Sequence, residues 1–266
     1  MEERAASRDS LGLRARLHHT MDFLPEKCRV IEPACGNGYV SELLAARGCA
    51  VTGFDRDAGA VGQVKVKGRF SVSDFYAFRP GRPADCVVCL ETLEHLPDDR
   101  KALKLMNSWL KPGGKLVLSV PVCRLTAGYR SAGHLRHYTD GKALEAMLRE
   151  SGFRVARKRY WGCLWTRLFW KHVKPRAAGK GEGGALVKLA RAVLRPLVAV
   201  DARMNLFRDN VIMECEKMDG LKLTPYGKFE RCAHQVRGYC LVLGHDVGAN
   251  GFSTAAHCGR CAKWEY

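Results

Sequence analysis

The seven residues EPACGNG, positions 32–38, place two glycines between a short apolar run and a segment with helical spacing. Glycine adopts the backbone conformations that a tight strand-to-helix turn requires, and it lets a ligand approach the main chain closely. The first N–H groups of the following helix are available to donate hydrogen bonds to that ligand. The stretch therefore predicts a ligand-binding turn at the carboxyl end of a strand.

Outward from this turn, the chain alternates β-branched runs with segments of helical spacing. The run DCVVCL at 85–90 is continuously apolar, as expected for a strand buried on both faces. Pro112-Gly113-Gly114 is expected to separate a helix from the strand that follows it. Expected strands are residues 30–31, 50–54, 69–72, 85–90, 115–120, 153–160 and 211–215, and expected helices are residues 39–47, 100–110 and 141–151. This βα order predicts an α/β fold with a mostly parallel sheet and helices on both faces.

Acidic residues near the turn indicate which ligand it holds. Glu32 would repel a pyrophosphate, and Ser41 occupies the third glycine position of the pattern that dinucleotide sites use. A carboxylate at position 32 suits a ligand that carries an ammonium and a sulfonium group. Asp55 follows the next strand, 23 residues after Glu32. A carboxylate there can accept hydrogen bonds from both hydroxyls of a ribose.

Five motifs, in order, resemble those of class I S-adenosylmethionine-dependent methyltransferases. The resemblance covers residues 28–160, with a final strand at 211–216, and its nearest likeness is to ubiquinone-biosynthesis O-methyltransferases and their small-molecule-modifying relatives. It implies a Rossmann-like sheet of seven strands whose last strand is antiparallel. The motifs are E-x-x-C-G-x-G from Glu32, Asp55, Ser73-Asp74-Phe75, LETLEHL at 90–96 and LKPGG at 110–114.

The resemblance also implies roles for individual residues in binding S-adenosylmethionine. Glu32, Gly36 and Gly38 would lie at the methionine portion of the cofactor, and Asp55 would bind the ribose. The adenine would contact Asp74 and Phe75, although Asp74 also suits a simple loop turn. Glu91 would close the pocket after the strand at 85–90.

Histidines follow two later strands at the same expected edge of the sheet. His95 comes after the strand at 85–90, and His134 and His137 lie in HLRHY, after the strand at 115–120. Histidine acts as a general base near neutral pH, so all three are candidate catalytic or acceptor-binding residues. Helix capping or loop packing is the alternative for each, and the sequence does not select one base among them.

Residues 161–209 form an expected helical insertion that is basic and aromatic. Residues 151–181 hold nine Lys or Arg and no Asp or Glu, and Trp161, Trp165 and Phe169 recur at helical spacing. Such helices can pack as ordinary core, dock on a membrane surface or cover a lipophilic acceptor, or bind single-stranded RNA. No RNA-binding module is recognisable, so nucleic acid is the weaker alternative. The net charge of +17 fits an acidic partner or a generally basic surface.

The tail at residues 219–266 is rich in cysteine and histidine. Four thiolates can satisfy tetrahedral zinc, and a metal would supply folding energy to a segment with little core. A structural zinc site is therefore one interpretation, and packed free cysteines or a redox role are the others. The candidate ligands are Cys232, Cys240, Cys258 and Cys261.

These features predict three regions: an N-terminal helical cap at 1–27, a methyltransferase domain at 28–218 and the tail. The expected function is methylation of an oxygen on a small-molecule, lipid-linked or quinone-like acceptor. Competing classes are an RNA methyltransferase and a non-catalytic cofactor-binding protein whose tail binds partners. No signal peptide or membrane-spanning run is evident, so a cytoplasmic protein is expected, with peripheral contact at the inner membrane face as a further hypothesis.

Overall fold

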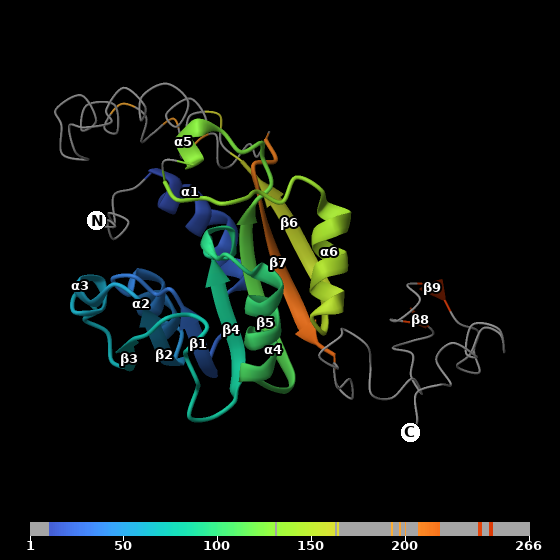
Figure 1. Ribbon diagram of the computed structural model, residues 1–266. Coiled ribbons are helices and arrows are strands. Elements are labelled where there is room, and N and C mark those ends of the chain that lie inside the picture. Colours follow the sequence, from blue (N-terminus) through green and yellow to red (C-terminus); the bar gives the residue numbers. More distant parts are fainter. Residues whose placement is uncertain are drawn as a thin grey trace.

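A computed structural model describes residues 11–130, 132–162 and 207–218, together with residues 164, 193, 197, 200, 239–240 and 245–246. Among these residues, seven strands form one sheet in the order β3-β2-β1-β4-β5-β7-β6 (Figure 1). The strands are β1 (Arg29–Pro33), β2 (Ala50–Asp55), β3 (Arg69–Val72), β4 (Ala84–Leu90), β5 (Leu110–Pro121), β6 (Phe153–Trp161) and β7 (Asn210–Lys217), and a separate pair is β8 (Tyr239–Cys240) with β9 (His245–Asp246).

Helices connect the strands in the alternating order expected from the sequence. Most predicted boundaries lie within a residue or two of the observed ones; β3, for example, spans the predicted residues 69–72. The helices are α1 (Leu11–Thr20), α2 (Tyr39–Ala46), α3 (Ala58–Val61), α4 (Asp99–Trp109), α5 (Ala127–Arg130) and α6 (Gly141–Glu150), with short 3-10 turns η1 (Met21–Phe23) and η2 (Leu93–His95).

The sheet is mostly parallel, as predicted. β1, β2, β3, β4 and β5 pair in parallel, whereas β7 is antiparallel to both β5 and β6. The chain runs outward from β1 to β3 and then returns to β4 on the other side of β1. This reversal makes a topological switch point between the carboxyl ends of β1 and β4, and open α/β sheets bind ligands outside the strand ends at such a point.

Side chains alternate between the two faces along each strand, and they form two hydrophobic cores, one on each face of the sheet. In β4, Val87 and Cys89 pack with α4 and α6, while Cys86 and Val88 pack on the opposite face with α2 and η1. The α4 side includes Trp109, which is 2% exposed. Helices therefore cover both faces, as predicted, and the residues left at the carboxyl edge are available to form a site.

One predicted break is absent. β5 begins at Leu110 and continues through Pro112-Gly113-Gly114, which were expected to separate it from the preceding helix. The pairing with β4 moves from Ala84↔Leu110 directly to Cys86↔Lys115, so the intervening residues form an irregularity within one strand. Gly113 has φ +68°, a conformation that glycine adopts without strain.

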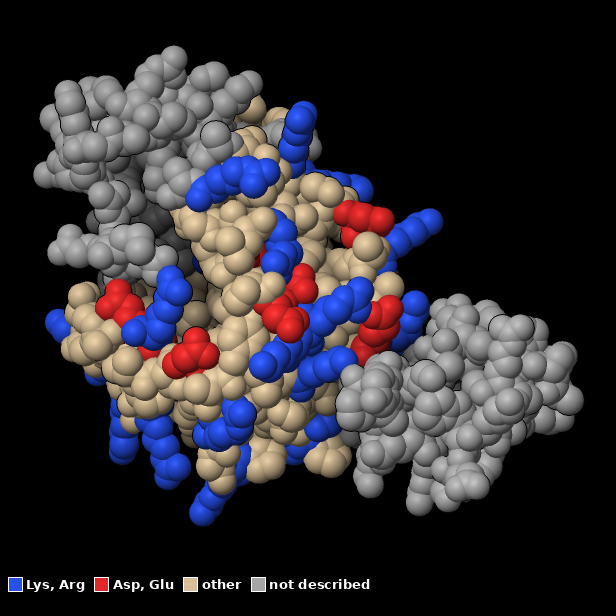
Figure 2. Space-filling view, in the orientation of Figure 1, with Lys and Arg blue, Asp and Glu red and all other residues tan. Residues whose placement is uncertain are grey.

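Parts of the predicted insertion and tail fall outside the described residues. Trp161 is 4% exposed and its ring stacks on His19 at 5.4 Å, so this aromatic residue belongs to the core. Trp165 and Phe169 lie outside the described residues. Among the residues that the structure does describe, no helix is both long and apolar enough to cross a membrane. Figure 2 shows basic side chains scattered over the visible face, with acidic ones among them near its centre.

Candidate active site

The glycine turn after β1 is held in an unusual backbone conformation. Ala34, Gly36 and Gly38 have φ values of +52°, +53° and +78°. A β-carbon on Gly38 would lie 2.8 Å from the Cγ1 atom of Val64, so both the torsion and the space require glycine there. The turn leads into α2, so the first N–H groups of this helix lie at the carboxyl end of β1.

Asp55, the predicted ribose ligand, also fixes this turn. Its Oδ2 atom accepts a hydrogen bond from the Gly36 N–H at 2.9 Å, and its Oδ1 atom accepts one from the Asp57 N–H at 3.0 Å. The end of β2 is therefore tied to the turn after β1. A carboxylate oxygen can accept more than one hydrogen bond, so these contacts leave capacity for a ligand hydroxyl.

Glu32 is a buried carboxyl group beside the same turn. Its exposed fraction is 6%, and Ser41 donates its hydroxyl to Glu32 Oε2. The pKa of Glu32 is raised to about 8, chiefly by burial and also by the nearby charge of Asp55, while the Ser41 hydrogen bond acts in the opposite direction. A ligand cation placed here would stabilise the ionised carboxylate, so the position suits the ammonium that the sequence predicts.

The turn after β3 shows where the predicted adenine contacts lie. Asp74 Oδ1 accepts hydrogen bonds from the N–H groups of Tyr76 at 2.8 Å and Ala77 at 3.3 Å, which is the turn-forming alternative for this residue. Phe75 is 6% exposed, and its ring packs against those of Phe54 and Trp109. Much of the Phe75 ring is therefore occupied by the core, and both adenine contacts stay predictions.

Glu91 follows β4, which pairs with β1, the strand before the glycine turn. Its φ is +50°, and its N–H donates to the Ser119 carbonyl at 2.9 Å. The Ser119 hydroxyl donates to Glu91 Oε1, and the Arg16 guanidinium of α1 lies 4.0 Å from Oε2. Residues of β4, β5 and α1 thus converge on this carboxylate.

The three candidate histidines meet in one cluster, although up to 42 positions separate them in the sequence. The His95 and His134 ring centroids are 4.6 Å apart, and those of His134 and His137 are 5.0 Å apart. His134 Nδ1 lies 2.9 Å from His137 Nε2. The cluster therefore combines the turn after β4 with the loop that joins β5 to α6.

Backbone carbonyls define the protonation of these rings. His137 Nδ1 lies 2.8 Å from the Cys123 carbonyl, so it carries a proton, and its Nε2 atom accepts from His134 Nδ1. Burial lowers the pKa of His137, which keeps that ring neutral. His95 Nδ1 donates to the Gly133 carbonyl at 3.0 Å. In the neutral form of the His95 and His134 rings, a proton on Nδ1 leaves Nε2 as the acceptor nitrogen.

The other residues of HLRHY fasten the loop to the turn after β4. Arg136 donates to the carbonyls of Leu96 at 2.8 Å and Pro97 at 2.9 Å, and its guanidinium lies 3.3 Å from Asp99. The Leu135 N–H donates to the Glu94 carbonyl at 2.9 Å, and the Tyr138 hydroxyl donates to Asp99 at 3.1 Å. These contacts position His134 and His137 without using their rings.

Sequence reasoning gave no role to Glu94, which lies between Glu91 and His95. It is 0% exposed, and one ligand atom from each of Glu94, His95 and His134 lies within 4.8 Å of the others. The signal was present as an acidic residue next to a candidate histidine in LETLEHL. Its meaning depends on His134, which only the fold brings close.

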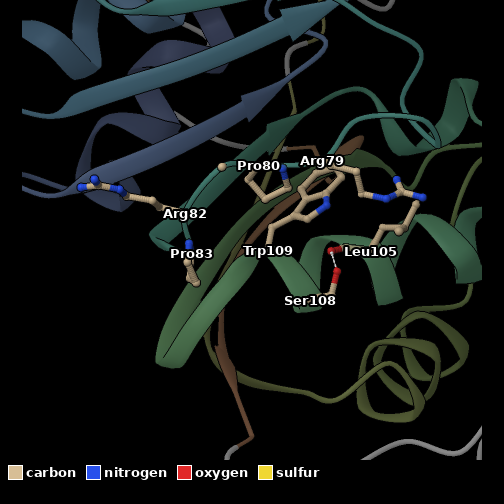
Figure 3. Close-up of a pocket in the computed structure, with 8 residues that line it drawn as sticks. Arg79, Pro80, Arg82, Pro83, Leu105, Ser108 and Trp109 are labelled. Atoms are coloured by element: carbon tan, nitrogen blue, oxygen red, sulfur yellow. Dashed lines mark hydrogen bonds between the residues drawn. The ribbon is translucent and has the colours of Figure 1, made fainter.

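A cavity of about 310 Å³ lies elsewhere, beneath the amino end of β4 (Figure 3). It is formed by the segment that leads into β4 and by α4, and Arg79 and Arg82 point away from one another in this view. None of the predicted site residues lines this cavity. The four predicted zinc ligands lie outside the residues whose side chains are described, so zinc in the tail stays a prediction.

Comparison with known proteins places the chain in a family. The profile of a family described as a methyltransferase domain matches residues 5–158. A ubiquinone biosynthesis O-methyltransferase of Xanthomonas euvesicatoria pv. vesicatoria (strain 85-10) is 41% identical over 104 residues, covering 34% of this chain and 42% of that protein. One from Pseudomonas syringae pv. tomato is 35% identical over 100 residues, covering 34% and 43%. The chain thus matches about two fifths of the length of these relatives.

Solved structures confirm the predicted fold. An S-adenosylmethionine-dependent methyltransferase from Mesorhizobium loti has a TM-score of 0.55 and 14% identity, with 78% of this chain and 100% of that chain covered. A corresponding protein from Archaeoglobus fulgidus has a TM-score of 0.53 and 20% identity, with 78% and 95% covered. At these identities the likeness concerns the fold alone.

Proposed function

The chain belongs to the class I S-adenosylmethionine-dependent methyltransferases, and we propose that it methylates a hydroxyl oxygen of a small-molecule acceptor. The proposal is supported by two chemically different groups that follow strands at the same carboxyl edge of the sheet. The glycine turn with Glu32 and Asp55 suits the cofactor, and the histidine cluster suits the acceptor. S-adenosylmethionine supplies an electrophilic methyl group on a positively charged sulfur.

Acidic groups of β1 and of the turn after β4 act on the same buried thiol. Burial raises the pKa of the Cys89 thiol, and the charges of Glu94, Glu91 and Glu32 also raise it. Cys89 lies near the end of β4, the strand that pairs with β1. The charge of Glu91 also raises the pKa of His137, opposing the effect of burial.

Methyl transfer to a hydroxyl needs alignment more than it needs a reactive protein group. The acceptor oxygen forms a bond to the methyl carbon as the carbon–sulfur bond breaks, and the hydroxyl proton must leave. His95 and His134 both follow strands at the carboxyl edge of the sheet, the side on which we expect the acceptor to enter. A ring nitrogen of either histidine is a candidate to receive the hydroxyl proton.

The proposed acceptor is lipophilic and quinone-like. The relatives named for ubiquinone biosynthesis support this class, although their match covers only about a third of the chain. Exposed apolar side chains lie in the predicted insertion, where Leu164, Val193 and Val200 are 37%, 57% and 56% exposed. Apolar side chains within a basic segment are the composition by which proteins contact a membrane interface or cover a lipophilic acceptor.

A panel of paired acceptors tests the proposal. The protein, with S-adenosylmethionine, is offered hydroxyl-bearing aromatic compounds and matched analogues in which an amine replaces the hydroxyl. Mass spectrometry should detect a methyl ether on the hydroxyl compounds and no methylated amine. Preferential methylation of the amines, or of short RNA offered in parallel, would contradict the proposed acceptor class.

A further inference from the structure

Trp109, the last residue of α4, carries a buried hydrogen-bond donor. The side chain is 2% exposed, and its indole Nε1 atom has no hydrogen-bond partner within the part of the chain that the structure describes. A buried N–H that leaves water without gaining an acceptor is destabilising, so nearly all such groups in native proteins are paired. An acceptor from outside the described residues would therefore stabilise this position.

Neighbouring aromatic rings hold the indole in place. Its ring centroid lies 5.8 Å from that of Phe54, 5.4 Å from that of Phe75 and 5.4 Å from that of Phe78. The interplanar angles with Phe54 and Phe78 are 84° and 85°, an edge-to-face arrangement that stabilises aromatic pairs. The indole cannot turn its N–H toward another acceptor without breaking these contacts. The donor is thus fixed in one direction, which lowers the cost of binding a ligand there.

The indole lines the cavity of about 310 Å³ beneath the amino end of β4 (Figure 3). Ligand-binding pockets begin at about this volume. In this view the indole nitrogen lies on the edge of the ring nearer the Arg79 side chain. Of the eight lining residues, all of which the structure describes, two are arginines and none is acidic. The apolar part of the lining comes from Pro80, Pro83, Leu105 and the indole itself.

The two arginines make the cavity favourable for an anion. Arg79 and Arg82 are exposed, and neither forms an ion pair with another residue that the structure describes. Arg79 donates to the carbonyls of Tyr76 at 2.9 Å and Phe78 at 2.8 Å, which are neutral acceptors and leave its charge unpaired. Arg82 points away from Arg79 in Figure 3, so it adds positive charge rather than a hydrogen bond to the same group.

We propose that this cavity binds a small aromatic carboxylate. The Trp109 N–H and the Arg79 guanidinium would donate to its oxygens, because a planar group with two oxygens can accept from both. The flat faces of the indole and the prolines suit an aromatic body. The cavity lies at the amino end of β4, whereas the predicted cofactor and acceptor residues follow the carboxyl ends of strands. It is therefore a second site, and it does not depend on the proposed methyl transfer.

Titration calorimetry with phenylacetate and phenylacetamide tests the site on the full chain. The two compounds share their shape, and only phenylacetate carries a charge. One equivalent of phenylacetate should bind with a dissociation constant of about 1 mM or lower, which a ligand of this size can reach. Phenylacetamide should bind at least about tenfold more weakly, since it cannot pair with a guanidinium charge. No saturable binding of phenylacetate below about 10 mM, or equal affinity for the amide, would overturn the proposal.

Substitutions locate the bound carboxylate. Arg79→Gln, at an exposed position, should weaken phenylacetate at least about fivefold, because a charge-assisted hydrogen bond is lost. Arg100→Gln is the matched control, since Arg100 lies on the exposed face of α4 in an ion pair with Glu150 and outside the cavity. It should leave phenylacetate affinity unchanged. Unaltered S-adenosylmethionine affinity in both variants shows that the fold is intact, and equal phenylacetate affinity in Arg79→Gln and the parent chain would exclude the cavity.

Nuclear magnetic resonance of the indole N–H groups reports the proposed donor directly. The chain has five tryptophans, and the Trp109 signal is the one that Trp109→Phe lacks. This signal should move as phenylacetate is added to the parent chain, because the carboxylate accepts from the N–H. It should move less with phenylacetamide at the same concentration. A Trp109 signal that stays in place when phenylacetate is saturating would show that the carboxylate binds elsewhere, which would overturn the site.

Discussion

The glycine turn at 32–38 and the histidine cluster lie at the same edge of the sheet, yet they are built in different ways. Main-chain torsions and the Gly36 N–H bond to Asp55 shape the turn. Side chains shape the cluster, and carbonyls of Gly133 and Cys123 orient them. The comparison teaches that local backbone chemistry can mark a cofactor site in one short motif, whereas the acceptor site depends on residues that the fold assembles.

The largest expected effect comes from removing a cluster ring. His134→Ala should lower the rate of methyl transfer by about 10²–10⁴, because the acceptor hydroxyl loses the group that promotes its deprotonation. Affinity for S-adenosylmethionine should change less than about twofold, since the turn is untouched. Single-turnover kinetics and calorimetry measure the two quantities. His18→Ala, at an exposed position on α1, is the control. If His134→Ala lowered cofactor affinity as much as it lowers the rate of methyl transfer, the histidine cluster and the glycine turn would not have separate roles.

The next effect concerns the turn. Asp55→Ala should weaken S-adenosylmethionine binding by about 1–3 kcal/mol, because charged hydrogen bonds to the ligand and to the Gly36 N–H are lost. Asp57→Ala is a matched control, since Asp57 caps α3 by accepting from the Ala60 N–H at 3.1 Å. It should cost about 1 kcal/mol of stability with little change in ligand affinity. Unchanged affinity in Asp55→Ala would remove the ribose assignment.

The pH dependence of cofactor affinity should further distinguish the glycine turn from the histidine cluster. The pKa of Glu32 is raised to about 8 in the unliganded fold, so this carboxyl group is mostly protonated below that pH. Binding of a cationic ligand favours the ionised form, so affinity should rise with pH by up to about tenfold per unit between pH 6 and 7.5. Calorimetry in buffers of different ionisation enthalpy should detect proton release on binding. Glu32→Gln should flatten the profile, and a persisting slope would assign it to another group.

The smallest effect is expected from added bulk in the turn. Gly38→Ala should lower the free energy of unfolding by about 1–2 kcal/mol, because the residue has φ +78° and the new β-carbon approaches Val64. Denaturant unfolding measures this change. Gly81→Ala is a suitable control, since its β-carbon would meet nothing within 4 Å. A stability loss no greater than that of the control would show that the turn tolerates side chains.

Strong local patterns made the fold and the turn predictable. The apolar run in β4 and the glycines at 36 and 38 are local sequence signals. Asp55 ends the strand that follows in the βα order, so its contact with Gly36 joins neighbouring strands. The continuity of β5 was missed because Pro112-Gly113-Gly114 suits a turn, and only pairing with β4 shows an irregularity inside a strand.

Tertiary contacts account for what was missed in the site. Glu94 and His134 are 40 positions apart, and Arg136 joins their segments through the Leu96 and Pro97 carbonyls. Arg16 approaches Glu91 from α1, which no motif connects to β4. Periodicity and propensity describe residues that are close along the chain, so they do not predict contacts between residues that only the fold brings together.

Transfer of label from methyl-labelled S-adenosylmethionine is the most direct test of the central claim. Purified protein is incubated with an extract of the source cells, which is then separated into organic-soluble, aqueous and RNA fractions. The account predicts label in the organic-soluble fraction with the parent chain and at least a hundredfold less with His134→Ala. Label confined to RNA, or no label in any fraction from a protein that binds the cofactor, would contradict it.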